Sequence, residues 1–512
     1  MRKNALIRCL CLSTLPLLPA CSDDAAAEGD YLDGGTGYAD EGGDGDGDGD
    51  GDEPSEEEEE EETGDGDGDE EPMCNDVDDV VLYLSPDDSN SMSSPVQIRE
   101  RVLIDDASSI SGVPVRVWEL MNYYTFPYPP AEDGQLALHA AMVPVEGETS
   151  TWALQLAVSS EVMTPEERPA MNVTLVLDTS GSMEGEPIEL LKATSRVIAS
   201  QLQQGDTVSV CEWDTENVWT LGGYAVSGPN DPMLLDVIDV VAAGGGTDLN
   251  GGLVSGYQLA QQVFDIEKVN RLVLISDGGA NAGVTEIELI AQNAMYGGSD
   301  GIYLVGVGVG DEGSYNDDLM NDVTDAGKGA SIFIPSNDEA WKVFGDDFEN
   351  TMAIAGRDVQ VELTMPPGFE IVKFSGEEFS ENPDEVEPQH IAPNDAMVFH
   401  QQVQTCAPEL VDDTAEITVT ASWEDPWTFE SKQVTQTWTW AELSAGDQGL
   451  LLKGAATLAY AEALHAYRKA VTGDDKQLAL VPAIEAVAAA QEALPGDADL
   501  AEMAQILAAL EQ

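Results

Sequence analysis

An apolar stretch that ends in three oxygen-bearing side chains is the most restrictive feature of this sequence. Residues 173–182 read VTLVLDTSGS, so a run of apolar and β-branched residues stops at Asp178, Ser180 and Ser182. A strand this apolar is typical of a parallel sheet with helices on both faces. Open sheets of that kind place their ligands at the carboxyl ends of the strands. Because the acid and the two hydroxyls offer hard oxygens, the stretch predicts a site for a small cation such as Mg²⁺.

Strands and helices alternate regularly from this stretch onward. Strands are expected at residues 173–178, 207–213, 217–222, 271–276, 302–307 and 330–334. Helices are expected at residues 186–203, 231–242, 249–264, 284–295, 315–326 and 337–350. Such alternation predicts an α/β domain over residues 169–356, built on a doubly wound, mostly parallel six-stranded sheet.

Period-two patterns typical of an antiparallel β-sandwich lie on both sides of the α/β domain. They fill residues 357–445 with five to six short strands and reappear as two strands in residues 135–160. We therefore expect residues 76–168 to contribute strands to the sandwich, with the α/β domain inserted between them. Residues 446–512 are rich in Ala and Leu at helical spacing and predict helices at 447–471, 475–493 and 498–511.

The N-terminus has the features of a bacterial lipoprotein signal. Residues 1–20 combine basic residues with an apolar stretch too short to span a membrane, and they end in LPA before Cys21. The sequence LPAC resembles a lipobox, which implies cleavage before Cys21 and lipid attachment there; an ordinary signal peptide is the alternative. Ser22 at the next position implies, by resemblance to such lipoproteins, sorting to the outer membrane. No later stretch approaches the length of a membrane-spanning helix, so the lipid is the expected membrane attachment.

Acidic residues dominate the chain and its predicted tether. Residues 21–75 contain long Asp-Gly and Glu runs with almost no apolar content, which predicts a disordered tether. The whole chain carries a formal net charge of −78, from 20 Lys and Arg against 98 Asp and Glu. This balance argues against nucleic acid or an anionic membrane surface as a partner.

Three of the six cysteines remain once the signal and the lipid site are set aside. Cys211 lies in the strand-like run TVSVCEW and is expected to be a buried free thiol. Cys74 and Cys406 can pair in an oxidising compartment, although the sequence alone leaves the connectivity open.

Further oxygen ligands are expected at the same edge of the predicted sheet. Thr247 and Asp248 lie in a glycine-rich turn before a predicted helix, and Asp277 ends the strand RLVLIS before Gly278 and Gly279. Loops at the carboxyl ends of neighbouring parallel strands lie close in space. These residues can therefore surround one point together with the polar end of strand 173–178.

This set of residues resembles the metal-ion-dependent adhesion site of the von Willebrand factor A domain. The resemblance covers about residues 170–350 and includes all five positions of the site: Asp178, Ser180, Ser182, Thr247 and Asp277. It implies that the three hydroxyls bind the metal and that the two carboxylates act directly or through water. It also implies Mg²⁺, with Mn²⁺ or Ca²⁺ as alternatives, and a protein partner whose Asp or Glu supplies a further ligand.

Other segments resemble the YfbK-type bacterial lipoproteins. These segments are VRVWELMNYYTFPYPPAEDG, GVGVGDEGSYNDDLM and LLKGAATLAYAEALHAYRKA. The resemblance implies a von Willebrand A domain between a distinctive N-terminal segment and a C-terminal extension.

Three functions compete at this point. The first is a lipoprotein of the bacterial cell envelope that binds a protein partner through a metal. The second is a structural envelope protein whose metal stabilises the fold, and the third is a metal-dependent hydrolase. An enzyme is not expected, because Ser180 stands where an aspartate phosphatase needs a second acid and no nucleophile elbow or P-loop is present. The four histidines also fall outside the predicted metal loops.

Overall fold

The computed structural model describes residue 74 and residues 77–86, 91–104, 110–278, 301–310, 315–327 and 329–511. The chain divides into two units, Met1–Asp69 and Glu70–Gln512, and all described residues belong to the second. The predicted signal peptide, Cys21, nearly all of the predicted tether and the predicted helix 284–295 lie outside the described residues. These features remain predictions.

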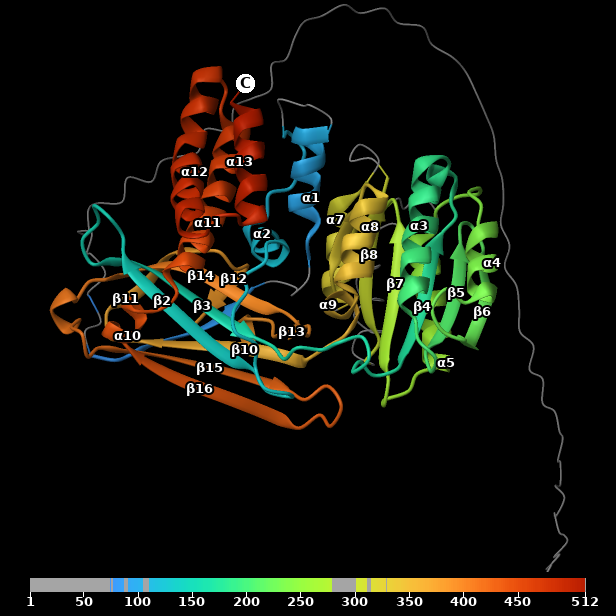
Figure 1. The fold of residues 1–512 in the computed structure, drawn as a ribbon, viewed down its shortest axis with the longest axis horizontal. Coiled ribbons are helices and arrows are strands. Elements are labelled where there is room, and N and C mark those ends of the chain that lie inside the picture. The colour runs from blue at the N-terminus through green and yellow to red at the C-terminus, as the bar shows by residue number, and fades with distance from the viewer. Residues whose placement is uncertain are drawn as a thin grey trace, which may run out of the picture. The chain divides into compact units, whose positions relative to one another are not determined.

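The α/β domain is built on a six-stranded sheet in the order β6-β5-β4-β7-β8-β9 (Figure 1). Its strands are β4 (Met171–Asp178), β5 (Thr207–Trp213), β6 (Asn217–Ala225), β7 (Val269–Ser276), β8 (Tyr303–Val309) and β9 (Ser331–Ile334). Neighbouring strands are parallel except for β5 and β6, which are antiparallel. Every residue of β4 is buried, as its apolar run predicts. The predicted six-stranded, mostly parallel sheet is confirmed.

Helices cover both faces of this sheet, as a doubly wound fold requires (Figure 1). They are α3 (Glu186–Gln201), α4 (Pro232–Val240), α5 (Leu249–Gln262), α7 (Asp317–Ala326), α8 (Asn337–Trp341) and α9 (Phe348–Met352). Alternate residues of β4 point to opposite faces: Leu175 packs in a core with α3 and α4, whereas Val176 packs in another with α5 and α7. The prediction of one continuous helix over residues 337–350 was wrong, because a π-helical segment, Lys342–Asp346, separates α8 from α9.

The remaining strands form two sheets that enclose a third core. One sheet contains β1 (Val80–Ser85), β10 (Gly356–Met365), β12 (Glu378–Ser380), β13 (Gln389–Ile391), β15 (Glu416–Glu424) and β16 (Ser431–Thr439). The other contains β2 (Ala137–Pro144), β3 (Thr151–Ser159), β11 (Phe369–Phe374) and β14 (Ala396–Thr405). Strand β3 precedes the α/β domain in the sequence and β14 follows it, yet the two strands pair with each other. The predicted insertion of the α/β domain into a β-sandwich is therefore confirmed.

Two features of the sandwich were not decided by the sequence. The sequence predicts that residues 76–168 contribute strands and locates two of them at residues 135–160, but a further strand, β1, pairs antiparallel with β10 inside the first sheet. Its six residues, VVLYLS, lack the alternation that marks a half-buried strand. Cys74 and Cys406 form a disulfide with Cα atoms 5.8 Å apart. Cys211 is a buried free cysteine, as expected.

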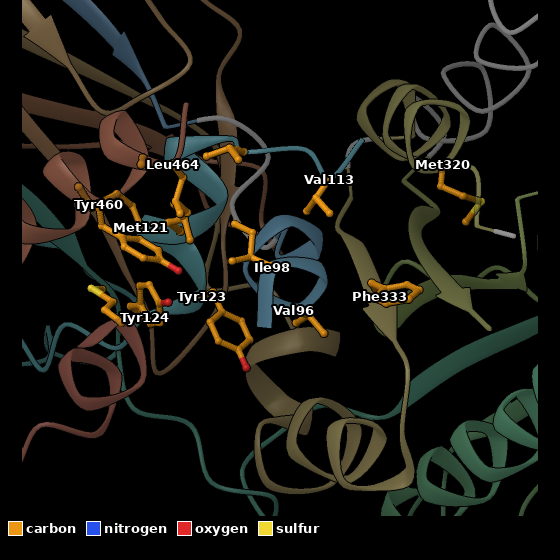
Figure 2. Close-up of a cluster of buried hydrophobic side chains, with 14 of the residues drawn as sticks. Val96, Ile98, Val113, Met121, Tyr123, Tyr124, Met320, Phe333, Tyr460 and Leu464 are labelled. Carbon is orange, nitrogen blue, oxygen red and sulfur yellow. The ribbon is translucent and has the colours of Figure 1, made fainter. Parts of the chain in front are cut away.

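Helices between β1 and β2 and helices after β16 complete the fold. The C-terminal helices are α10 (Trp440–Ser444), α11 (Gln448–Lys469), α12 (Gly473–Ala493) and α13 (Ala498–Leu510), and the N-terminal helices are α1 (Ser93–Arg99) and α2 (Val117–Tyr123). One buried cluster joins these N-terminal helices to α11 and to the α7 side of the sheet, as the side chains in Figure 2 show. Within the described residues, no helix is long and apolar enough to cross a membrane.

Candidate metal centre

Asp178 lies at the carboxyl end of the central strand β4 and is fully buried. Its Oδ1 accepts a hydrogen bond from the backbone N–H of Ser180 at 2.8 Å, and its Oδ2 accepts one from the hydroxyl of Ser276 at 2.6 Å. A short 3₁₀ turn, Gly181–Met183, follows and presents the hydroxyl of Ser182 beside that of Ser180. The loop after β4 therefore folds back over the end of the strand, and the side-chain oxygens of Ser180 and Ser182 lie side by side.

The glycine-rich turn before α5 contacts this first loop directly. The N–H of Gly244 donates to the carbonyl of Thr179 at 2.7 Å, and the N–H of Gly181 donates to the carbonyl of Gly245 at 3.2 Å. These bonds bring Thr247, which is 1% exposed, to the same edge of the sheet. Asp248 has a different role, because its side chain accepts from the N–H of Gly251 at 2.9 Å and caps α5.

Asp277 follows the neighbouring strand β7 and is also buried, at 2% exposure. Burial raises the pKa of the Asp178 carboxyl to about 6; the hydrogen bonds from Ser276 and Ser180 oppose this shift, and the nearby charge of Asp277 adds to it. Two carboxylates thus lie close together in a poorly hydrated place. A cation between the loops would compensate their charge and lower the pKa of Asp178.

The spacing of the hydroxyls fits a small octahedral cation. Two ligands at right angles around Mg²⁺, each roughly 2.1 Å from the ion, lie about 3 Å apart. The Oγ atoms of Ser180 and Ser182 are 3.0 Å apart and hydrogen-bonded to each other, a separation that also suits two neighbouring metal ligands. Hydroxyl and carboxylate oxygens are also the donors that Mg²⁺ prefers. The donor set therefore fits the metal that the sequence predicts.

Exposure differs among the hydroxyls of the site. Ser180 and Thr247 are buried, whereas Ser182 is exposed. The candidate centre is therefore enclosed by the sheet on one side and reaches the protein surface at Ser182.

The described part of the chain contains no cluster of the side chains that most often bind metals in proteins. No three His, Cys, Asp or Glu side chains there are placed to hold a metal together. The four histidines lie in the sandwich and on α11: His139 on β2, His390 on β13, His400 on β14 and His465 on α11. A metal at the sheet edge would therefore depend on the serine and threonine hydroxyls.

Ser276 also belongs to the candidate centre, although the sequence motifs did not predict it. Ser276 holds Asp178 through its hydroxyl, and that hydroxyl also accepts from the N–H of Gly278 at 2.9 Å. The available signal was its position: Ser276 is the only polar residue in the second half of RLVLIS, directly before Asp277. A hydroxyl at the end of an apolar strand is the kind of group that orients a neighbouring ligand.

Comparison with known proteins identifies the α/β domain. Residues 172–345 match the family model described as von Willebrand factor type A domain. The chain therefore carries a von Willebrand factor type A domain, a kind of domain that generally mediates protein–protein interactions and often does so with a metal. The resemblance drawn from the five site positions is confirmed for the domain, whereas the ligand roles of those positions stay predictions.

Relatives extend the similarity beyond the domain. The chain is 25% identical over 264 residues to "Uncharacterized protein YfbK" of Escherichia coli (strain K12), covering 50% of this chain and 45% of that protein. It is 25% identical over 223 residues to "Uncharacterized protein sll0103" of Synechocystis, covering 43% of this chain and 50% of that protein. The chain thus spans about half the length of these relatives, and its resemblance to YfbK-type proteins is confirmed.

A solved structure described as "von Willebrand factor type A from Catenulispora acidiphila" is also similar. It is 15% identical with a TM-score of 0.46, covering 70% of this chain and 87% of that one.

Proposed function

We propose that the von Willebrand factor type A domain of this chain binds a divalent cation, Mg²⁺ first among the candidates, and uses it to hold a protein partner. Ser180, Ser182 and Thr247 would supply hydroxyl oxygens, while Asp178 and Asp277 would act directly or through water. The observation that carries this proposal is the pair of Oγ atoms 3.0 Å apart, which matches neighbouring positions on an octahedral ion.

The ligand set favours an anionic partner group. Three of the five proposed ligands are neutral hydroxyls, so a bound ion keeps much of its positive charge and its attraction for a further oxygen. Mg²⁺ also retains water readily, and such a water can be replaced by an incoming ligand. Because Ser182 lies on the exposed side of the centre, an Asp or Glu of the partner can approach there. Mn²⁺ and Ca²⁺ accept the same oxygens.

We also propose that the protein acts at the bacterial cell envelope, anchored in the outer membrane by lipid on Cys21. The lipobox-like sequence before Cys21 and the acidic residues 21–75 support this proposal. Acidic, glycine-rich composition of this kind is typical of a tether, which would let the folded unit reach partners away from the membrane surface.

Equilibrium unfolding tests the metal site. Mg²⁺ at 100 times its dissociation constant should stabilise the wild-type protein by about 2.7 kcal/mol, because the ion binds the folded state alone. Asp178→Asn should abolish this gain. With a chelator present, the variant should be at least as stable as wild type, since it removes a buried carboxylate whose pKa burial raises.

Asp239→Asn is the matched control. Asp239 is an exposed carboxylate on α4, paired with Arg196 at 2.6 Å. This variant should keep the full Mg²⁺ response. Equal unfolding curves for wild type with Mg²⁺ and with chelator would refute metal binding.

Affinity capture from envelope extracts tests the partner. A specific protein should bind the wild type and the Asp239→Asn control in Mg²⁺, and it should be lost with chelator or with Asp178→Asn. Stabilisation by Mg²⁺ without any Mg²⁺-dependent capture would instead support the structural alternative.

A further inference from the structure

The N-terminal segment, residues 91–104 and 110–126, docks against the edge of the α/β sheet. The N–H of Met92 donates to the carbonyl of Ser331 on the edge strand β9 at 2.8 Å, and the N–H of Ser331 donates to the hydroxyl of Ser91 at 3.2 Å. Val96 of the segment belongs to the same buried cluster as Phe333 of β9 (Figure 2). The segment thus covers strand groups that would otherwise form an open edge.

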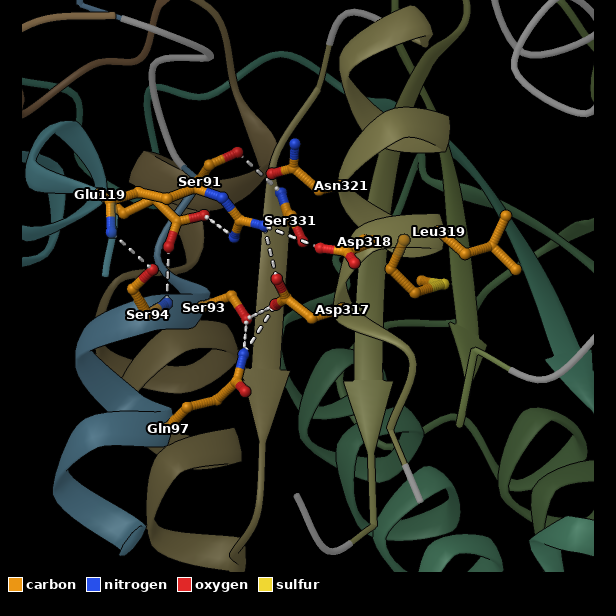
Figure 3. Close-up of polar contacts among 12 residues, drawn as sticks. Ser91, Ser93, Ser94, Gln97, Glu119, Asp317, Asp318, Leu319, Asn321 and Ser331 are labelled. Atoms are coloured by element: carbon orange, nitrogen blue, oxygen red, sulfur yellow. Dashed lines mark hydrogen bonds and ion pairs between the residues drawn. The ribbon is translucent and has the colours of Figure 1, made fainter. Parts of the chain in front are cut away.

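Polar groups of this segment surround one carboxylate of the α/β domain, Asp317 at the start of α7 (Figure 3). Its Oδ1 accepts from the hydroxyl of Ser93 at 2.6 Å and from the side-chain amide of Gln97 at 2.7 Å. Its Oδ2 accepts from the guanidinium of Arg116 at 2.6 Å. Three side chains from a remote part of the sequence therefore fix both oxygens of one acid.

The arginine in this network is itself held in place. Its guanidinium bonds to the carboxylate of Glu119 at 3.1 Å, and Glu119 is fully buried and accepts from the N–H of Ser94 at 2.6 Å. Charge-assisted bonds in a poorly hydrated place are among the strongest in proteins. Asp317 is consequently tied to a rigid group of partners.

The residues directly before Asp317 touch the candidate metal centre. The N–H of Asn316 donates to the carbonyl of Asp277 at 3.2 Å. Gly278 has φ +76°, and a Cβ there would come within 2.8 Å of the carbonyl oxygen of Asn316. Tyr315 is packed on Phe333 with ring centroids 4.9 Å apart. The turn that carries Asp277 therefore rests directly on Asn316, the residue before Asp317.

We infer that Asp317 is a positioning residue through which the N-terminal segment fixes the Asp277–Gly278 turn and so sets the affinity of the centre for its cation. The inference rests on the proposed metal site and extends it to a part of the chain outside the α/β domain. Octahedral Mg²⁺ tolerates little displacement of its ligands, and loss of groups that orient metal ligands typically reduces metal affinity by 10- to 100-fold.

Titration calorimetry of the mature full-length chain with Mg²⁺ and, separately, with Ca²⁺ tests the inference. Asp317→Ala should raise the Mg²⁺ dissociation constant by about 10-fold or more. Ser93→Ala, which removes one bond to Asp317 and perturbs folding less, should raise it several-fold. Because Ca²⁺ accepts flexible geometry, both variants should weaken Ca²⁺ binding less than Mg²⁺ binding.

The change in the ratio of Mg²⁺ to Ca²⁺ affinity distinguishes positioning from general destabilisation. Asp206→Asn is the control, because Asp206 is also an arginine-bound carboxylate, more deeply buried than Asp317, and it precedes β5 at the opposite end of the sheet. It should lower stability and leave both affinities unchanged.

Each outcome separates the two proposals. Wild-type Mg²⁺ affinity in both Asp317→Ala and Ser93→Ala would overturn the inference and leave the proposed function intact. An equal loss of Mg²⁺ and Ca²⁺ affinity, shared by Asp206→Asn, would also overturn it. Absence of Mg²⁺ binding by the wild type would overturn both proposals. The expected affinity changes without Mg²⁺-dependent capture of a protein would support the inference and refute partner binding.

Discussion

His400 should make the folded protein sensitive to mild acid. It lies on β14 with 1% of its surface exposed, and its Nδ1 is 3.0 Å from Oε1 of Gln155. The amide of Gln155 donates through Nε2 to the carbonyl of Leu450 at 2.9 Å, so its Oε1 faces the imidazole and accepts a proton from Nδ1. The imidazole is therefore held neutral between the sandwich and α11.

The size of the effect follows from the pKa of this group. Burial lowers the pKa of His400 from 6.5 to about 4. Between these values the unfolded chain binds a proton that the folded protein does not, so stability is lost as the pH falls through this range. The linkage relation gives a loss of about 2 kcal/mol from pH 7 to pH 5 and about 3 kcal/mol by pH 4.

Urea unfolding at a series of pH values measures this contribution. His400→Gln keeps a donor to Gln155 and removes the titration, so the difference in unfolding free energy between wild type and variant should shrink as the pH falls. His465→Gln is the control, because His465 lies exposed on α11 and its replacement should change the pH dependence far less. Parallel loss of stability in wild type and His400→Gln between pH 7 and pH 5 would refute the reasoning.

Two further predictions concern bonds that stabilise the fold away from the metal centre. Asp206→Asn should cost about 3–5 kcal/mol of unfolding free energy in urea titrations, because the buried guanidinium of Arg168 loses the carboxylate 2.6 Å away and keeps only Glu349 at 3.9 Å. Replacing both Asp206 and Arg168 with apolar residues should cost less, and a larger loss in the double variant would contradict this. Replacing both Cys74 and Cys406 with Ser should lower the unfolding free energy by about 2–5 kcal/mol. The disulfide joins residues 332 positions apart and so restricts the unfolded chain. Equal urea midpoints for this variant and the wild type would contradict that account.

The loops of the candidate centre could be predicted because their signals are local. Asp178 ends β4 and Asp277 follows β7, two mostly apolar strands that are buried along their whole length, and parallel strands bring their carboxyl ends to one edge. The same rule placed Asp248 in the centre, although it caps α5 instead. A polar residue before a helix can be either a metal ligand or a helix cap, and only the direction of its side chain distinguishes the two roles.

The insertion of the α/β domain was also predictable, because the period of the hydrophobic pattern changes at both of its ends. Strand β1 was not identified because VVLYLS lacks period-two alternation, and periodicity alone does not distinguish a short buried strand from part of a buried helix. The pairing of Cys74 with Cys406 depends on where two distant loops meet, and spacing along the chain carries no such information.

The network around Asp317 shows a different kind of limit. Its partners Ser93, Gln97 and Arg116 precede it by 224, 220 and 201 residues. Ser93 and Gln97 are four residues apart and so share one face of α1. In the sequence SSPVQIR that face looks like a solvent-exposed one, yet residues 93–98 are all buried. A polar face on a buried helix must bond to another part of the protein, and here that part is the segment beside the candidate metal centre. The residues that would hold a cation can therefore be found from local patterns, whereas the residues that position them become visible only once burial is known.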